Sequence, residues 1–154
     1  MITSAEEFRQ RLLDIQNGSS TILTTLPSTE QRFRIDANTR TVNIPSEFGF
    51  LGVQNDHRAE TIYFEIDRYF DSEDLSRHTC IVQFVNSKNE GIYPVTSYDL
   101  TSVDGKIIFG WTIGNDATQI NGDIEFAIRF YTIDQDYRFL YNFNTLSSKS
   151  KILN

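Results

Sequence analysis

Hydrophobic and polar residues alternate with a period of two over most of the chain after about residue 32. The clearest case is "TIYFEI" (61–66), where Ile62, Phe64 and Ile66 fall on one side of an extended chain and Thr61, Tyr63 and Glu65 fall on the other. A period of two is typical of β-strands that bury one face. We therefore expect a strand here, and similar strands through the rest of this region.

Turn-forming sequences divide the alternating region into predicted strand units. These units are a hairpin at 32–45 around 36–38, two strands at 48–66 around 55–58, a hairpin at 79–100 around "NSKNEG", a strand at 105–113, and the strongest hairpin at 122–143 around 134–136. Two of these strands have a clear apolar face that we expect to point inward, made of Ile107, Phe109, Trp111 and Ile113 in the first and of Ile124, Phe126, Ile128 and Phe130 in the second. About eight to ten short strands without an intervening helix predict an all-β fold, namely an antiparallel β-sandwich of the Ig-like or jelly-roll-like kind.

The period is helical at the N-terminus, and residues 4–16 are predicted to form a short helix. Ser4 is a suitable N-cap, and Glu7 three positions later completes a capping box. The helix carries one apolar stripe, formed by Phe8, Leu12 and Ile15. An isolated helix of about a dozen residues is marginal in water, so it must dock either on its own sheet or on a partner. In the second case the stripe is the predicted partner-binding site.

The chain is predicted to have three parts. Residues 1–31 form the helix and a Ser/Thr-rich connector arm, residues 32–146 form the β-sandwich domain, and residues 147–154 form a polar tail. A chain of 154 residues with 39% hydrophobic residues is large enough for one domain with a real core.

The charge and the cysteine count exclude several function classes. A net charge of −7, without clustered Lys or Arg, counts against nucleic-acid binding and against an anionic membrane surface. The N-terminus lacks the apolar region of a signal peptide. Cys80 is the only cysteine, and with only His57 and His78 beside it a zinc site lacks ligands. We expect no metal and no cofactor, and folding in a reducing compartment.

Four carboxylates gather after the 61–66 strand: Asp67, Asp71, Glu73 and Asp74. Carboxylate oxygens suit Ca²⁺, but this stretch lacks the glycine and the final glutamate of an EF-hand loop. Acidic residues between two strands usually cap a turn in water. We therefore expect a corner where the strand leaves its sheet.

His78 and Cys80 lie two apart on a predicted strand and so face the same side, which makes a thiolate–imidazole pair conceivable. The stretch "TCIVQFV" is nevertheless typical of a core strand, where a free cysteine is usually packed. No serine nucleophile elbow, P-loop or dinucleotide fingerprint occurs. We expect no catalytic residues and no enzymatic activity.

The aromatic residues leave a second function open. They could line a sugar-binding face, or they could form the sandwich core and ordinary cross-strand pairs. The residues concerned are Tyr63, Tyr69, Phe70, Tyr93, Tyr98, Trp111, Tyr131, Tyr137 and Tyr141. The alternative function is therefore a carbohydrate-binding module that recognises host cell-surface polysaccharide.

The succession from about Leu26 to Leu146, above all "DHRAETIYFEIDRYFD" and the closing "YNFNT", resembles a family of small virion structural proteins. Tailed phages and prophages of Firmicutes encode this family, whose members are described as minor structural or baseplate-type proteins. The resemblance implies a β-sandwich that builds or decorates a virion and is made in the cytoplasm of the host bacterium. It brings no catalytic residues.

Because the chain has no long distal region, we expect an adaptor, anchor or decoration unit of the tail, baseplate, neck or head rather than a complete fibre. Its expected partners are other virion subunits and further copies of itself. Glycan contact remains open.

Overall fold

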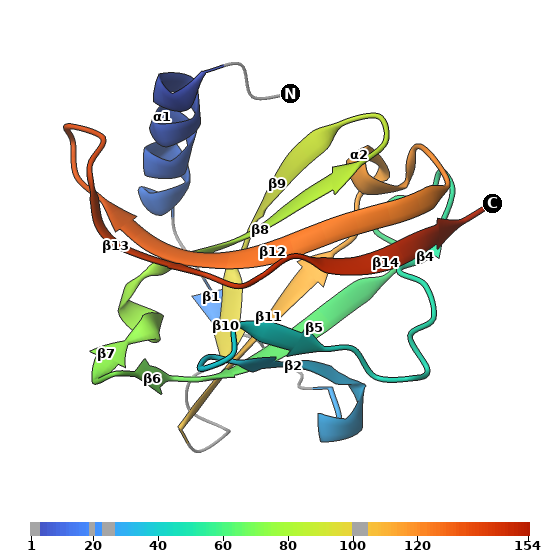
Figure 1. The fold of residues 1–154 in the computed structure, drawn as a ribbon, viewed down its shortest axis with the longest axis horizontal. Helices are drawn as coiled ribbons and strands as arrows, with labels where there is room; N and C mark the ends of the chain where they lie inside the picture. The colour runs from blue at the N-terminus through green and yellow to red at the C-terminus, as the bar shows by residue number, and fades with distance from the viewer. Residues whose placement is uncertain (1–3, 19–20, 23–26, 100–104) are drawn as a thin grey trace.

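The computed structural model describes residues 4–18, 21–22, 27–99 and 105–154, with the backbone alone for 21–22 and 97–99. Two six-stranded sheets, here called sheet A and sheet B, pack face to face, and one helix, α1 (Ala5–Gln16), stands on the outer face of sheet B (Figure 1). The all-β sandwich expected from the alternation is confirmed. The predicted connector falls partly outside the described residues.

Sheet A carries both parallel and antiparallel pairs. Its order is β1 (Thr21–Ile22), β10 (Ser97–Asp99), β11 (Lys106–Thr112), β5 (Thr61–Asp67), β2 (Arg32–Asp36) and β3 (Thr41–Asn43). The β2–β3 pair is the hairpin predicted at 32–45. The β1–β10 and β2–β5 pairs are parallel. Alternation along single strands gives no information on strand direction, so the sequence did not predict these pairs.

Sheet B is built around one long strand, β12 (Gly122–Ile133). The sheet order is β4 (Gly52–Val53), β14 (Ser148–Leu153), β12, β8 (Thr79–Asn86) and β9 (Glu90–Pro94), with β13 (Phe139–Asn144) also paired to β12. The first half of β12 pairs with β14 and its last half with β13. The β8–β9 and β12–β13 pairs are the predicted hairpins at 79–100 and 122–143.

The core fills the space between the two sheets with interlocking aromatic rings. Trp111 of sheet A lies with its ring centroid 5.6 Å from that of Phe126 of sheet B, and Phe109 lies 5.9 Å from Phe130. The predicted inward face of β11 is confirmed, since the following residues are all buried: Ile107, Phe109, Trp111 and Ile113. Such tilted and edge-to-face ring pairs add to the stabilisation that burial alone gives.

The two strands predicted at 48–66 do not form a hairpin. The first, β4, belongs to sheet B and the second, β5, belongs to sheet A, so the chain crosses between the layers. The turn between them contains left-handed residues at Asn55 and Arg58. Between β11 and β12 the chain also forms a short helix, α2 (Asn115–Thr118), where we expected none. Two 3₁₀ turns, η1 (Thr29–Gln31) and η2 (Leu75–Arg77), precede β2 and β8.

Residues 147–154, expected as a polar tail, contain β14. This strand pairs with β12 on one side and with β4 on the other. Lys149 and Lys151 point outward, and Ile152 is buried in the core. The stretch is polar because its outer face is charged and its inner face begins with two serines, Ser148 and Ser150. Polarity therefore did not distinguish a strand inside the sheet from a loose terminus.

Candidate interaction surface on the outer face of sheet B

The predicted stripe of α1 packs on sheet B of its own chain. Leu12 is fully buried in a second, smaller cluster with Ile81, Ile92, Tyr131 and Ile133, and Phe8 and Ile15 pack against it. The expected cap forms, because the Ser4 hydroxyl oxygen accepts a hydrogen bond from the Glu7 amide at 3.1 Å. Of the two docking modes left open above, the structure has the one within the chain. Contact of the stripe with a partner stays a prediction.

Two side chains connect α1 to the end of β12 by hydrogen bonds. The Gln16 side chain donates to the Ile133 carbonyl at 3.2 Å and accepts from the Ile133 amide at 2.9 Å, so it satisfies both backbone groups where β12 ends. The Tyr131 hydroxyl donates to the Leu12 carbonyl. Together with the burial of Leu12, these hydrogen bonds fix the position of the helix along the sheet.

Arg129 marks the border where α1 stops covering sheet B. Its guanidinium lies over the rings of Phe8 and Phe139, at 5.4 and 5.5 Å from their centroids. Its Nε donates to the Gln83 side chain at 2.9 Å, and Nη1 donates to Asn142 at 3.4 Å. Burial lowers the pKa of Arg129. The cation is therefore occupied by contacts within the chain.

Beyond Arg129 the outer face of sheet B forms a hollow of about 390 Å³, which we call the open trough. Its floor and rim come mainly from β8, β9 and β12, and its lining includes Gln83, Val85, Glu90, Ile92, Glu125 and Ala127. Val85 leaves 38% of its surface exposed, whereas Ile92 is buried. The trough thus exposes Val85 and part of Ala127 among polar side chains, and it lies beside the docked helix.

The border of the trough is acidic. Within the part of the chain that the structure describes, no ion pair involves Glu90 or Glu125. Lys149 stands opposite Glu125 in the β14–β12 register without forming an ion pair with it. Sequence analysis missed this trough because its residues come from three strands, and only the sheet register brings them together.

The acidic stretch after β5 is divided among separate contacts. Asp71 and Ser72, both left-handed, form the turn of a small hairpin between β6 (Tyr69–Phe70) and β7 (Glu73–Asp74). Asp74 pairs with Arg68 at 3.1 Å, and Asp67 pairs with Lys106. Among the described residues, no three His, Cys, Asp or Glu side chains group as metal ligands.

His78 lies in a hydrogen-bonded chain that the sequence did not reveal. Its Nδ1 is 2.7 Å from the Thr132 hydroxyl, and its Nε2 is 3.0 Å from a Glu73 carboxylate oxygen. This hydroxyl–imidazole–carboxylate order matches the connectivity of a nucleophile, a base and an orienting group. The hollow that His78 lines, near the end of α1, is lined by neither Thr132 nor Glu73. The imidazole instead stacks on Tyr141, with ring centroids 4.2 Å apart, and fastens the β6–β7 hairpin to sheet B.

Cys80 does not share the surroundings of His78. Its side chain is fully buried in the main core, and burial raises the pKa of its thiol well above the ordinary value. A protonated, inaccessible thiol is a poor nucleophile. The packed cysteine that we expected is what the structure has.

Most of the candidate sugar-binding aromatic side chains are buried or half-buried. Trp111 and Tyr131 are buried, and Tyr69 is the exposed one among those whose side chains the structure describes, with 56% of its surface accessible. The others are half-buried: Tyr63, Phe70, Tyr93, Tyr137 and Tyr141. The side chain of Tyr98 lies outside the described part. Glycan binding stays a prediction.

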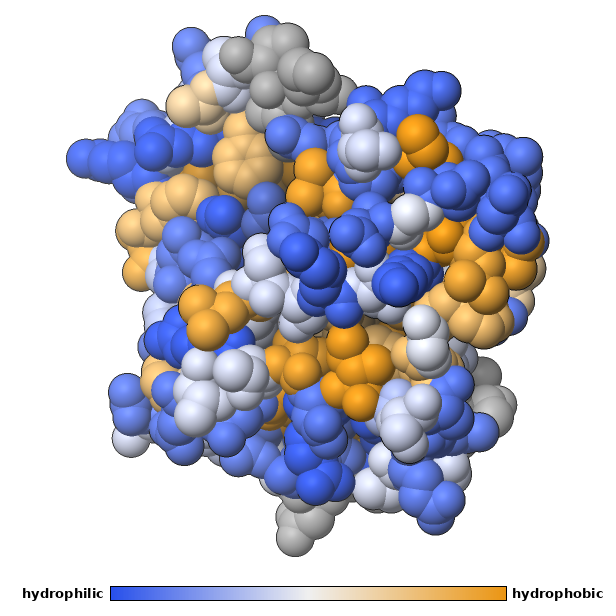
Figure 2. Space-filling model, turned by 45° about the vertical axis from the view of Figure 1, so that its right-hand side comes forward, coloured by the Kyte–Doolittle hydropathy of each residue, from blue (hydrophilic) through white to orange (hydrophobic). Residues whose placement is uncertain are grey.

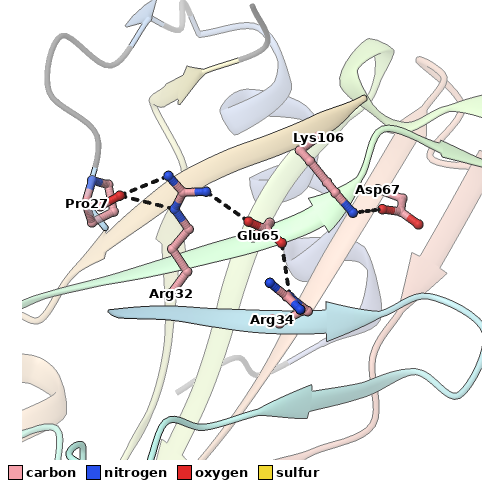
Figure 3. Close-up of polar contacts among 6 residues, drawn as sticks. All are labelled: Pro27, Arg32, Arg34, Glu65, Asp67 and Lys106. Atoms are coloured by element: carbon pink, nitrogen blue, oxygen red, sulfur yellow. Dashed lines mark hydrogen bonds and ion pairs between the residues drawn. The ribbon is translucent and has the colours of Figure 1, made fainter. Parts of the chain in front are cut away.

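One carboxylate on the outer face of sheet A is almost completely buried. Glu65 is 3% exposed and accepts hydrogen bonds from Arg32 at 2.9 Å and from Arg34 at 3.1 Å (Figure 3). Arg32 also donates twice to the Pro27 carbonyl, and so it holds the chain that enters β2. Both oxygens of Glu65 are occupied, which makes this network structural.

Exposed apolar side chains form separate patches surrounded by hydrophilic residues on the side where β14 ends (Figure 2). Val53 and Leu153, both exposed, stand opposite each other in the parallel β4–β14 pair. No described helix is long and apolar enough to span a membrane.

Comparison of the chain with protein-family models, curated proteins and solved structures finds no match to any of them.

Proposed function

We propose that this chain is a non-enzymatic structural protein of a tailed-phage particle and acts through protein–protein contact as an adaptor, anchor or decoration unit. The resemblance of residues 26–146 to small virion proteins motivates the proposal. The observation that supports it best is the open trough. Sheet B buries its inner face against sheet A, and the chain's own helix covers only part of its outer face, so the trough is left open for another contact.

The chemistry of the reactive side chains supports the same proposal. Cys80 is buried, and the ring nitrogens of His78 are hydrogen-bonded to Thr132 and Glu73, neither of which lines the hollow that His78 borders.

The direct test is to purify particles from an induced host and to identify their proteins by mass spectrometry. We expect the chain at a fixed ratio to one of the tail, neck or head proteins, and we expect immunogold labels at one position on the particle. If the chain is present in the lysate but absent from purified particles, the proposal is wrong. Binding to a bacterial wall-glycan array that is lost in Tyr69→Ala would favour the carbohydrate-binding alternative instead.

A further inference from the structure

The outer face of β12 changes in character along its length. Tyr131 and Ile133 lie under α1, Arg129 stands at the border, and Ala127 and Glu125 continue into the open trough. The face that supports α1 therefore continues beyond the helix, over β12, β8 and β9 (Figure 1). The small side chain of Ala127 at this point allows another segment to approach the sheet closely.

The floor of the trough offers an apolar contact. Val85 projects from β8 with more than a third of its surface exposed, and Ile92 and Ala127 border the same hollow. In the register of sheet B, Val85 stands opposite Glu90 on one side and Glu125 on the other, and Ala127 stands opposite Gln83. A partner would need a small apolar contact surface to cover Val85 and Ala127.

The charges of the trough set the chemistry of the partner. Glu90 and Glu125 have no ion pair within the described residues, while the nearby cation of Arg129 is already held by two rings and two amide side chains. The chain as a whole has a net charge of −7. A basic segment would be attracted to this surface, and an acidic one repelled.

We propose that the open trough binds a basic amphipathic helix of another virion subunit, which lies on sheet B beside α1. The inference depends on the proposed function and adds the surface and the class of partner. The apolar side of that helix covers Val85 and Ala127, and its Lys or Arg side chains pair with Glu90 and Glu125, which stand on either side of Val85 in the sheet register. Recognition of this kind combines a groove contact with charge complementarity.

The first test compares two synthetic helical peptides of Leu and Ala, one carrying Lys and the other Glu at its polar positions, by calorimetric titration of the full chain. We expect the Lys peptide to bind, and Glu90→Lys with Glu125→Lys to weaken binding about tenfold, since two attractions become repulsions. The control is Glu47→Lys with Glu60→Lys, which makes the same net charge change at exposed carboxylates outside the trough. Equal weakening by both variants, no binding of the Lys peptide, or equal binding of the two peptides would overturn the inference.

The second test places a photo-crosslinking amino acid at Val85, and as a control at Glu47, in chains assembled into particles. We expect a crosslink from position 85 to a basic segment of a different virion protein. A crosslink to a second copy of this chain, or no crosslink from position 85 in particles that contain the chain, overturns the inference and leaves the proposed function standing. If purified particles lack the chain, the proposed function is wrong. In that case the peptide titration still tests whether the trough binds a basic helix.

Discussion

Glu65 shows how a charged residue can occupy a buried position on a sheet. The side chain of Arg32 is 8% exposed, so Glu65 and Arg32 have both left water and depend on each other. Arg34 contacts the other carboxylate oxygen but remains 60% exposed. A buried pair contributes little net stability, but removing one partner leaves an uncompensated charge.

Glu65→Ala should lower the free energy of unfolding by about 3 kcal/mol, because it leaves the buried guanidinium of Arg32 without its counter-ion. Arg34→Ala should cost less than about 1 kcal/mol, since its charge is already solvated. Asp67→Ala, which breaks the exposed pair with Lys106, is the matched control and should also cost less than about 1 kcal/mol. Urea unfolding measures all three, and equal losses would mean that the buried pair does not behave as described.

Asp74 should make the protein sensitive to acid. Burial raises its pKa, but hydrogen bonds from Arg68 and Ser76 outweigh this and leave the pKa below the ordinary value of 3.8. The unfolded chain therefore takes up the proton first as the pH falls. The stability that Asp74 provides is complete above the ordinary pKa and is lost as the pH drops through the lower folded value.

In Asp74→Asn we expect a loss of about 1 kcal/mol at pH 6, and a smaller further loss than in the natural protein between pH 5 and pH 2. Unfolding free energies across this range are the measurement, and Glu47→Gln, at an exposed carboxylate, is the control. An acid-induced loss that is the same in Asp74→Asn as in the natural protein would contradict the role assigned to this carboxylate.

Among the elements, α1 depends most on its surroundings. Its twelve residues are too few for a stable helix in water. The helix is therefore stabilised by the burial of Leu12 and by the hydrogen bonds of Gln16 and Tyr131. The sheet depends on the helix in return, because Ile81 and Ile133 would otherwise face solvent.

Leu12→Ala should cost about 3 kcal/mol of unfolding free energy, the usual effect of truncating a fully buried leucine. Arg11→Ala, at an exposed position next to it, should change the unfolding free energy by less than about 0.5 kcal/mol. Light scattering on both variants shows in addition whether the helix acts within one chain. If Leu12→Ala leaves stability unchanged but lowers the oligomer mass, the stripe serves a partner and not its own sheet.

For the molecule as a whole, the single cysteine and the single tryptophan report on the same core. Cys80 comes from sheet B and Trp111 from sheet A, and both are buried between the layers. If the sandwich opens as one unit, the two residues should become accessible together.

Accordingly, Cys80 should react with a thiol reagent at least roughly a thousandfold more slowly in the native protein than in denaturant, because a stable domain rarely opens. The denaturant midpoint for thiol exposure should coincide with the midpoint for Trp111 fluorescence. Cys80→Ala serves as the control for the reagent. Rapid labelling under native conditions would mean that the two sheets separate locally.

The sequence alone predicted the fold class, the capped N-terminal helix, and the inward faces of β5, β11 and β12. Each of these depends on the spacing of apolar residues along a single segment, such as Ile107 to Ile113, and spacing is readable without knowledge of neighbours. The buried Cys80 followed in the same way from the composition of β8.

Only the tertiary structure decided which segments meet. It paired β2 with β5 in parallel, placed β4 and β5 in different sheets, and ordered residues 148–153 as a strand between two others. It also put Glu65 between two arginines and formed the open trough from three strands. The physical reason is that pairing partners, buried charges and surface hollows depend on residues far apart in the chain, whereas a local pattern determines only which side of its own strand each residue faces.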